Sequence, residues 1–139
     1  MGIWKTEMSI EALQSFMKNT LVDHLGIEIT EIGDDFICAS MPVDSRTHQP
    51  MGLLHGGASV VLAETLGSMA AQLAAEPGHH CVGLEINANH LSGIRSGFVY
   101  GTASPIHIGR STQVWDIRIV DENGKGVCAS RLTMAVLQN

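Results

Sequence analysis

The sequence predicts a single α+β domain in which one long helix packs against an antiparallel β-sheet. A stretch from about 58 to 75 is apolar around most of the circumference of a helix, which indicates burial on more than one side. Two strand-like segments precede this helix, and segments with alternating apolar residues follow it. The 139 residues suit one domain, and no repeat, linker or low-complexity tract divides 1–139.

Caps, turns and periodicity predict the elements before the long helix. Ser9 is placed to cap a helix whose apolar residues recur at helical spacing up to about Asn19. A second short helical turn ends near Gly26. The segments 27–32 and 36–43 are strand-like and flank a Gly-Asp-Asp turn, so we expect them to form a hairpin.

Turn signals also bound the long helix and the strands after it. Two glycines at 56 and 57 open the helix, and Pro77-Gly78 ends it. We expect strands over 81–91, 97–108, 113–120 and 127–137, with a strong Asp-Glu-Asn-Gly turn before the last of them. One helix leaves a face or an edge of such a sheet uncovered, so pairing of two copies is expected.

Charge limits the classes of function. The net charge is −6 and the pI is near 5.5, which disfavours a nucleic-acid partner because such proteins usually carry a basic surface. Only 16% of the residues are charged. Assembly of several copies would reduce the surface that these few charges must cover.

Cysteine usage and hydropathy predict a cytoplasmic protein. Cys38, Cys81 and Cys128 are odd in number and have no zinc-site spacing, which is typical of reduced and mostly buried thiols. We see no signal peptide and no apolar run long enough to span a bilayer, so no membrane partner is expected. The adjacent His79 and His80 have no third ligand in view, and we expect no metal.

A carboxylate in the middle of the long helix is the strongest chemical signal. No Lys or Arg lies between Arg46 and Arg95, so Glu64 cannot form a local i, i+4 salt bridge. Burying an unpaired carboxylate is costly, and the side chain must reach solvent, meet a partner or have a function. The wide apolar circumference argues against a merely solvated stripe. Ser68, one turn later, either holds a water or bonds back to the Glu64 carbonyl.

The start of the same helix is electropositive, because the first N–H groups of a helix lack internal partners. Glycines there let a carbonyl oxygen approach closely, and we expect the Gly56 N–H to hold an oxyanion. His55 either polarises a carbonyl group or serves only as a cap.

The spacing of these two features predicts a site shared between subunits. Eight residues separate Gly56 from Glu64, which corresponds to roughly 12 Å of helix rise. Both groups of one chain therefore cannot touch a single carbonyl group. A second, antiparallel copy would place its Glu64 beside Gly56 of the first.

Sequence blocks over nearly the whole chain carry a family resemblance. The blocks are Ile3-Trp4-Lys5, His24-Leu25-Gly26-Ile27, Met41-Pro42-Val43-Asp44-Ser45-Arg46-Thr47, Gln49-Pro50, Gly52-Leu53-Leu54-His55-Gly56-Gly57-Ala58-Ser59, Leu62-Ala63-Glu64, Gly83-Leu84-Glu85-Ile86-Asn87-Ala88-Asn89-His90, Gln113-Val114-Trp115 and Ser130-Arg131-Leu132-Thr133. Together they resemble the bacterial hot-dog-fold thioesterases that hydrolyse 1,4-dihydroxy-2-naphthoyl-CoA in menaquinone biosynthesis. They also resemble the relatives that proofread aryl carrier proteins in enterobactin assembly.

The resemblance implies a hot-dog fold, in which a curved antiparallel sheet wraps one long central helix, with dimers pairing into a homotetramer. It implies that Glu64 is the nucleophile or general base. It also implies that Gln49, His55 and Gly56 surround the thioester, with Ser68 near the attacking water. No cofactor is implied, because coenzyme A is part of the substrate.

Substrate contacts are implied with one departure from the family pattern. The residues expected to bind substrate are Gly57, Val82, Gly83, His90, Ser92, Arg95, Gly109 and Arg110. The family has an Arg two positions after the His of its Asn-Ala-Asn-His block, and this chain has Ser92 there. Arg95 or Arg110 would then be the residue that contacts a CoA phosphate.

The sequence thus predicts an acyl-CoA thioesterase, with 1,4-dihydroxy-2-naphthoyl-CoA as the first candidate substrate. A misloaded aryl carrier protein or a broad range of acyl-CoA thioesters are the alternatives within this activity. A hot-dog dehydratase, a non-catalytic acyl-CoA-binding module and a purely structural oligomer are the alternatives of other classes. Glu64 in its apolar helix argues against the binding module.

Overall fold

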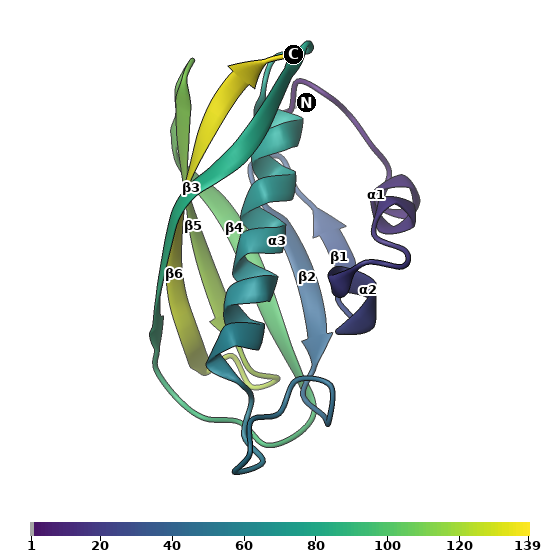
Figure 1. Cartoon of the computed structure of the whole chain (residues 1–139), viewed down its shortest axis with the longest axis vertical. Coiled ribbons are helices and arrows are strands. Elements are labelled where there is room, and N and C mark those ends of the chain that lie inside the picture. The colour runs from purple at the N-terminus through teal and green to yellow at the C-terminus, as the bar shows by residue number, and fades with distance from the viewer. Residues whose placement is uncertain (1) are drawn as a thin grey trace.

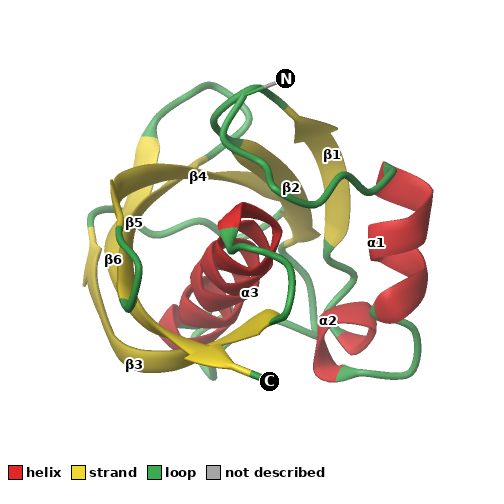
Figure 2. Cartoon of the chain, turned by 90° about the horizontal axis from the view of Figure 1, so that it is seen from above, coloured by secondary structure: helices red, strands yellow, loops and turns green. Residues whose placement is uncertain are grey.

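The computed structural model describes residues 2–139, and in it a curved antiparallel sheet wraps around one long helix (Figure 2). The elements are α1 (Ile10–Phe16), α2 (Leu21–His24), β1 (Glu28–Ile32), β2 (Ile37–Pro42), α3 (Gly56–Ala74), β3 (His79–His90), β4 (Phe98–Ile108), β5 (Thr112–Val120) and β6 (Gly126–Gln138). The strands lie in the order β1-β2-β4-β5-β6-β3. No helix within these residues is long and apolar enough to cross a membrane.

The predicted elements are confirmed, with boundaries that differ by three residues or fewer. Ser9 caps α1 as expected, and its side chain accepts a hydrogen bond from the Ala12 N–H at 3.1 Å. The helix ends at Phe16 instead of near Asn19. Asn19 has a φ of 62°, a left-handed conformation that cannot continue a right-handed helix.

The strand order has one feature that the sequence pattern did not predict. After β2 the chain passes through α3 to the far edge of the sheet, where β3 pairs with β6 instead of with β4 (Figure 1). The other edge of β3 has no neighbouring strand in residues 2–139. Apolar side chains remain exposed on this strand, with Val82 41% and Leu84 60% accessible. An open, partly apolar edge strand is a surface that proteins normally cover.

The sheet encloses α3 closely because small residues lie at the points of contact. A Cβ atom on Gly67 would lie 2.5 Å from Cδ2 of Leu132, and one on Gly101 would lie 2.8 Å from Cδ1 of Leu66. Glycine at these positions lets helix and strands approach without overlap. Large buried side chains, among them Trp115, fill the remaining core.

The two ends of α3 lie at opposite ends of the molecule. The helix begins beside the 43–55 loop and the connection from β3 to β4, and it ends near the two chain termini (Figure 1). The N-terminal segment crosses the second end. There Trp4 stacks on Trp115 with ring centroids 6.2 Å apart, and its Nε1 donates to the Gly33 carbonyl at 2.7 Å.

Trp4→Ala is expected to lower the free energy of unfolding by about 2–3 kcal/mol, because it removes the ring stacked on Trp115 and one hydrogen bond. Urea titration at one fixed protein concentration measures this change. Phe16→Ala is the control, since Phe16 is 75% exposed and should shift stability by less than about 0.5 kcal/mol. Equal effects of the two changes would contradict a structural role for the N-terminal segment.

Candidate functional site

His55 is the N-cap residue of α3. Its Nδ1 accepts a hydrogen bond from the Gly57 N–H at 2.8 Å, and its own N–H donates to the Thr47 carbonyl at 2.7 Å. An Nδ1 that accepts must be unprotonated, so the neutral ring carries its proton on Nε2. The cap predicted from the sequence is therefore confirmed. The Nε2–H remains able to donate to a carbonyl group, so the two roles are compatible.

Within residues 2–139 the Gly56 N–H has no acceptor, whereas the next two N–H groups of the chain are both hydrogen-bonded. Gly57 donates to His55, and Ala58 donates to the His55 carbonyl at 2.9 Å. The imidazole of His90 lies against Gly56, where an added Cβ would be 2.8 Å from its Nε2. The helix start thus offers a free donor, approached closely by one ring, as an oxyanion site requires.

Gln49 faces the same region from the loop before α3. Its Oε1 accepts from the N–H groups of Met51 and Leu53, which can only donate, so the amide orientation is fixed. The Nε2 group then points away from the loop, and no acceptor for it is found in residues 2–139. A bound carbonyl group is the kind of acceptor that this amide can serve.

Gln49, Gly56 and His90, but not His55, line a pocket of about 310 Å³ at the start of α3. Its lining residues are Gln49, Leu53, Leu54, Gly56, Ser59, His90, Leu91, Ser92, Gly93 and Val127. Polar groups at the helix start and apolar side chains around them suit a ligand with one carbonyl group and an apolar body. Ser59 was not predicted from the sequence as a site residue, although its position three residues after Gly56 places both on one helix face.

Glu64 lies in the middle of α3 and is half-buried. Within residues 2–139 its carboxylate has neither a hydrogen-bond donor nor an ion-pair partner. Its Oε2 lies against the backbone of β3, where a Cβ on Gly83 would be 2.9 Å away. A bulge between Gly83 and Glu85 interrupts the pairing of β3 with β6 at this point. The glycine and the bulge together leave room for the carboxylate.

Ser68 lies one turn after Glu64, as predicted, and its hydroxyl makes only a weak contact. The contact is with Sδ of Met134, at 3.9 Å. No bond back to the Glu64 carbonyl is found in residues 2–139, so that alternative is not supported. Val82 precedes Gly83 on β3 and is exposed.

Three of the residues expected to bind substrate, among them the two candidate phosphate contacts Arg95 and Arg110, lie at two different ends of the helix. Ser92 is held at the α3 start, where its hydroxyl donates to the Gly126 carbonyl at 2.6 Å. Arg95 is at the same end, and its Nη1 donates to the Met51 carbonyl at 3.2 Å. Arg110 is instead near the end of α3, far along the helix from Gly56.

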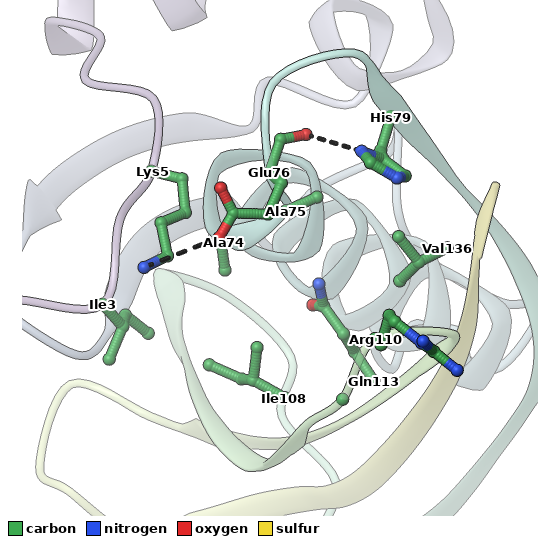
Figure 3. A pocket seen from close by; sticks show the side chains of 11 residues that line it. Ile3, Lys5, Ala74, Ala75, Glu76, His79, Ile108, Arg110, Gln113 and Val136 are labelled. Carbon is green, nitrogen blue, oxygen red and sulfur yellow. Dashed lines mark hydrogen bonds and ion pairs between the residues drawn. The ribbon is translucent and has the colours of Figure 1, made fainter. Parts of the chain in front are cut away.

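Arg110 and Gly109 line a pocket of about 620 Å³ at the end of α3 (Figure 3). The close-up shows Lys5 paired with Glu76, with 3.8 Å between Nζ and Oε1. Side chains of Ile3, Ile108 and Val136 make the apolar part of the lining. This pocket combines an apolar wall with two cations.

Burial and pairing shift only a few pKa values. Hydrogen bonds from the side chain and the backbone N–H of Arg46 lower the pKa of Asp44 to about 2 in the loop before α3. Burial raises the pKa of the Cys81 thiol, and that of Cys128 likewise. Cys81 is on β3 two residues before Gly83, and a raised pKa disfavours the thiolate form that nucleophilic attack would need. Residues 2–139 contain no cluster of three or more acidic, His or Cys side chains suited to a metal ion.

One chain provides the two parts of an acyl-transfer site, a hydrogen-bond donor for the oxyanion and a carboxylate, but these two groups lie far apart. The donor at Gly56 and the carboxylate of Glu64 are separated by roughly 12 Å of helix rise in one chain. Thr47, Gln49 and His55 hold the first half in place, and β3 bounds the second. A single carbonyl group can meet both halves only if they come from two chains.

Comparison with known proteins identifies relatives that span the whole chain. Residues 51–128 match the family model of the thioesterase superfamily. The chain is 53% identical over 135 residues to a 1,4-dihydroxy-2-naphthoyl-CoA hydrolase of Escherichia coli, covering 97% of this chain and 99% of that protein. It is 55% identical over 135 residues to a proofreading thioesterase of Cronobacter turicensis, covering 97% and 98%. A crystal structure of a thioesterase from Haemophilus influenzae superposes with a TM-score of 0.96 at 53% identity, covering 98% and 95%.

Gly83→Ala is expected to lower kcat for thioester hydrolysis by roughly 10- to 100-fold, because the new Cβ displaces the Glu64 carboxylate from its position. KM should change much less, since the pocket at the start of α3 is untouched. Steady-state kinetics with an aryl-CoA thioester measures both constants.

Gly124→Ala is the control, because its Cβ would meet nothing within 4 Å and the turn before β6 lies outside both pockets. We expect that variant to keep the wild-type kcat. A Gly83→Ala protein with unchanged kcat would show that the room beside Glu64 is not needed.

Proposed function

The chain belongs to the thioesterase superfamily and is a thioester hydrolase with the hot-dog fold, and we propose that it acts on aromatic acyl-CoA thioesters in the cytoplasm. The first candidate substrate is 1,4-dihydroxy-2-naphthoyl-CoA, an intermediate of menaquinone biosynthesis, because a relative that carries this name is 53% identical. The relative named a proofreading thioesterase supports the alternative, a misloaded aryl carrier protein. The observation that carries the proposal is the unpaired carboxylate of Glu64, the one charged side chain of α3.

The thioester carbonyl is proposed to bind at the start of α3. Its oxygen accepts from the Gly56 N–H, where the helix dipole favours developing negative charge. The Nε2 groups of Gln49 and His55 are the further donors available to orient it. These donors come from fixed backbone and from side chains that the fold already holds, so little reorganisation is required when charge develops.

Glu64 of the partner subunit is the group proposed to drive hydrolysis. Its carboxylate either attacks the carbonyl carbon to form an acyl-enzyme anhydride, which water then hydrolyses to release the acid and restore Glu64, or removes a proton from a water that attacks the thioester directly. In both routes the C–S bond breaks and CoA leaves as a thiolate that takes up a proton. Ser68 is one turn from Glu64, and its weakly bonded hydroxyl is available to a water molecule.

The homo-oligomer required by this mechanism is proposed to form along β3. Its open edge and exposed Val82 and Leu84 offer a surface for antiparallel pairing with a second copy. Such pairing also runs the two α3 helices antiparallel, which is the orientation that brings Glu64 of one to Gly56 of the other. A homotetramer made of two such dimers is the assembly that we propose.

The CoA moiety is proposed to extend away from the thioester toward basic residues. In an antiparallel pair, the end of one α3 lies toward the start of the other. The pocket with Gly109 and Arg110 could then receive the nucleotide, with an apolar wall for the base and Lys5 as a second cation. Arg95, bonded to the loop at the α3 start, is the alternative phosphate contact.

Glu64→Gln is expected to lower kcat at least 1,000-fold on any thioester that the wild type hydrolyses, because the amide can neither attack nor accept the proton. Free-thiol release measures turnover with 1,4-dihydroxy-2-naphthoyl-CoA, benzoyl-CoA, a long-chain acyl-CoA and a dihydroxybenzoyl-loaded aryl carrier protein. The ranking of these substrates discriminates between quinone biosynthesis, proofreading and broad hydrolysis.

Glu31→Gln, an exposed change on β1, is the control and should retain full activity. Tight binding of these thioesters by the wild type without thiol release would instead support the acyl-CoA-binding module. Wild-type turnover by Glu64→Gln would remove Glu64 from the mechanism.

Mixing two inactive variants is expected to restore activity if each site uses two chains. Gly56→Pro deletes the donor N–H, yet proline suits the first position of a helix. His55 already has the extended conformation (φ −68°, ψ 130°) that a residue before proline prefers, and the proline ring has to displace only the exposed side chain of His90, so the fold should persist. An equal mixture of Gly56→Pro and Glu64→Gln subunits should regain about one quarter of wild-type activity after exchange. About half of the dimers are then mixed, and each mixed dimer has one intact site of two.

The two variants assayed separately provide the baseline, and size-exclusion chromatography verifies that each remains assembled. A mixture no more active than its components, with exchange demonstrated by mass spectrometry, would contradict the shared site.

A further inference from the structure

Ser59 lines the pocket at the start of α3 and has no part in the mechanism described above. The residue is only 1% exposed, whereas Gly56, three residues earlier, is half-buried. Residues three apart share one face of a helix. Ser59 is therefore placed on the inner side of the same pocket, beyond the point where the carbonyl group binds.

The hydroxyl of Ser59 has no protein partner within residues 2–139, unlike most buried polar side chains here. Thr47 donates to the Pro42 carbonyl at 2.8 Å, Ser130 to the Asn87 carbonyl at 2.8 Å, and Gln113 to the Ala71 carbonyl at 3.3 Å. Ser40 also lacks a bond, but it lies on β2 and is not part of this pocket.

The hydrogen bond that a serine in a helix usually makes to its own helix backbone is not available to Ser59. A serine in a helix normally donates to the carbonyl four residues earlier, which here is that of His55. That carbonyl already accepts from the N–H groups of Ala58 at 2.9 Å and Ser59 at 3.2 Å. A carbonyl oxygen has two lone pairs, and both are taken. Residues 2–139 contain no buried side-chain N or O atom without a partner, so the unbonded Ser59 hydroxyl must reach the surface of the pocket, where it is available to a ligand.

We propose that the Ser59 hydroxyl hydrogen-bonds a hydroxyl group next to the thioester carbonyl on an aromatic acyl group. This inference rests on the proposed function, because the proposed function places the thioester carbonyl oxygen at the Gly56 N–H. The CoA arm must leave toward solvent, so the acyl group occupies the inner side, where Ser59 lies. A substituent on the ring atom beside the carbonyl is then the part of the substrate closest to Ser59.

The chemistry of the two partners matches. A serine hydroxyl both donates and accepts, as does a phenolic hydroxyl, so either can orient to suit the other. Leu53, Leu54 and Val127 give the same pocket apolar walls for the ring. In 1,4-dihydroxy-2-naphthoyl-CoA the 1-hydroxyl is bonded to the carbon next to the one that carries the acyl group. Ser59 would thus select aryl thioesters by the position of one hydroxyl.

The test compares kcat/KM of the wild type and Ser59→Ala on 2-hydroxybenzoyl-CoA, 4-hydroxybenzoyl-CoA and benzoyl-CoA. Intrinsic reactivity of each thioester cancels when the two proteins are compared on the same substrate. We expect Ser59→Ala to lose about tenfold on the 2-hydroxy substrate and less than about threefold on the other two. Alanine favours a helix and removes a single atom, so the variant should fold.

Ser130→Ala is the matched control, because it removes a buried serine that is bonded to Asn87 and lies outside the pocket. It should leave the ratios among the three substrates unchanged. Equal losses on all three substrates in Ser59→Ala, or no loss on any, would overturn this inference and leave the thioesterase assignment standing. Failure of the wild type to hydrolyse any thioester in the wider panel would overturn the proposed function, and this inference with it.

Discussion

The close packing of α3 inside the curved sheet is the constraint on which the rest of the molecule depends. The helix is enclosed along one side by strands that approach it at Gly67 and Gly101, and it therefore has little freedom to shift or bend. A helix held this firmly keeps the Gly56 N–H and the Glu64 carboxylate at a constant separation. Preorganised donors of this kind stabilise developing charge without a cost of reorganisation at the moment of reaction.

The exposed edge of the sheet, strand β3, lies beside the carboxylate of this tightly packed helix. The buried side chains of α3 pack against the sheet, and β3, the strand at the open edge of that sheet, keeps Val82 and Leu84 accessible. Glu64 lies against this strand at Gly83, where a bulge breaks the regular pairing. The carboxylate, the open edge and the bulge thus occur together. An assembly along β3 would bury the apolar edge and complete the site in one step.

Polar groups at the start of α3 divide into those that build the site and those left for a ligand. His55 Nδ1, Gln49 Oε1 and the Ser92 hydroxyl all bond backbone groups nearby, and these bonds hold the loop and the helix cap. The Gly56 N–H and the Ser59 hydroxyl have no such partner in residues 2–139. Both groups adjoin one pocket, and unbonded groups of this kind are the ones that a bound substrate would meet.

The sequence by itself determined the order of the elements, the buried character of the long helix, and the separation of Gly56 from Glu64, because these follow from periodicity, turn residues and helix rise along one segment. It also singled out the Gly56 N–H as the candidate oxyanion donor and Glu64 as the lone carboxylate of the helix, since both lie on a single continuous element. Only the tertiary structure decided that β3 pairs with β6 at the sheet edge, that Arg95 and Arg110 lie at opposite ends of α3, that Gly83 lies against the Glu64 carboxylate, and that Ser59 lines the pocket. Those facts depend on contacts between segments far apart in the chain, and neither local propensity nor spacing encodes which distant strands meet.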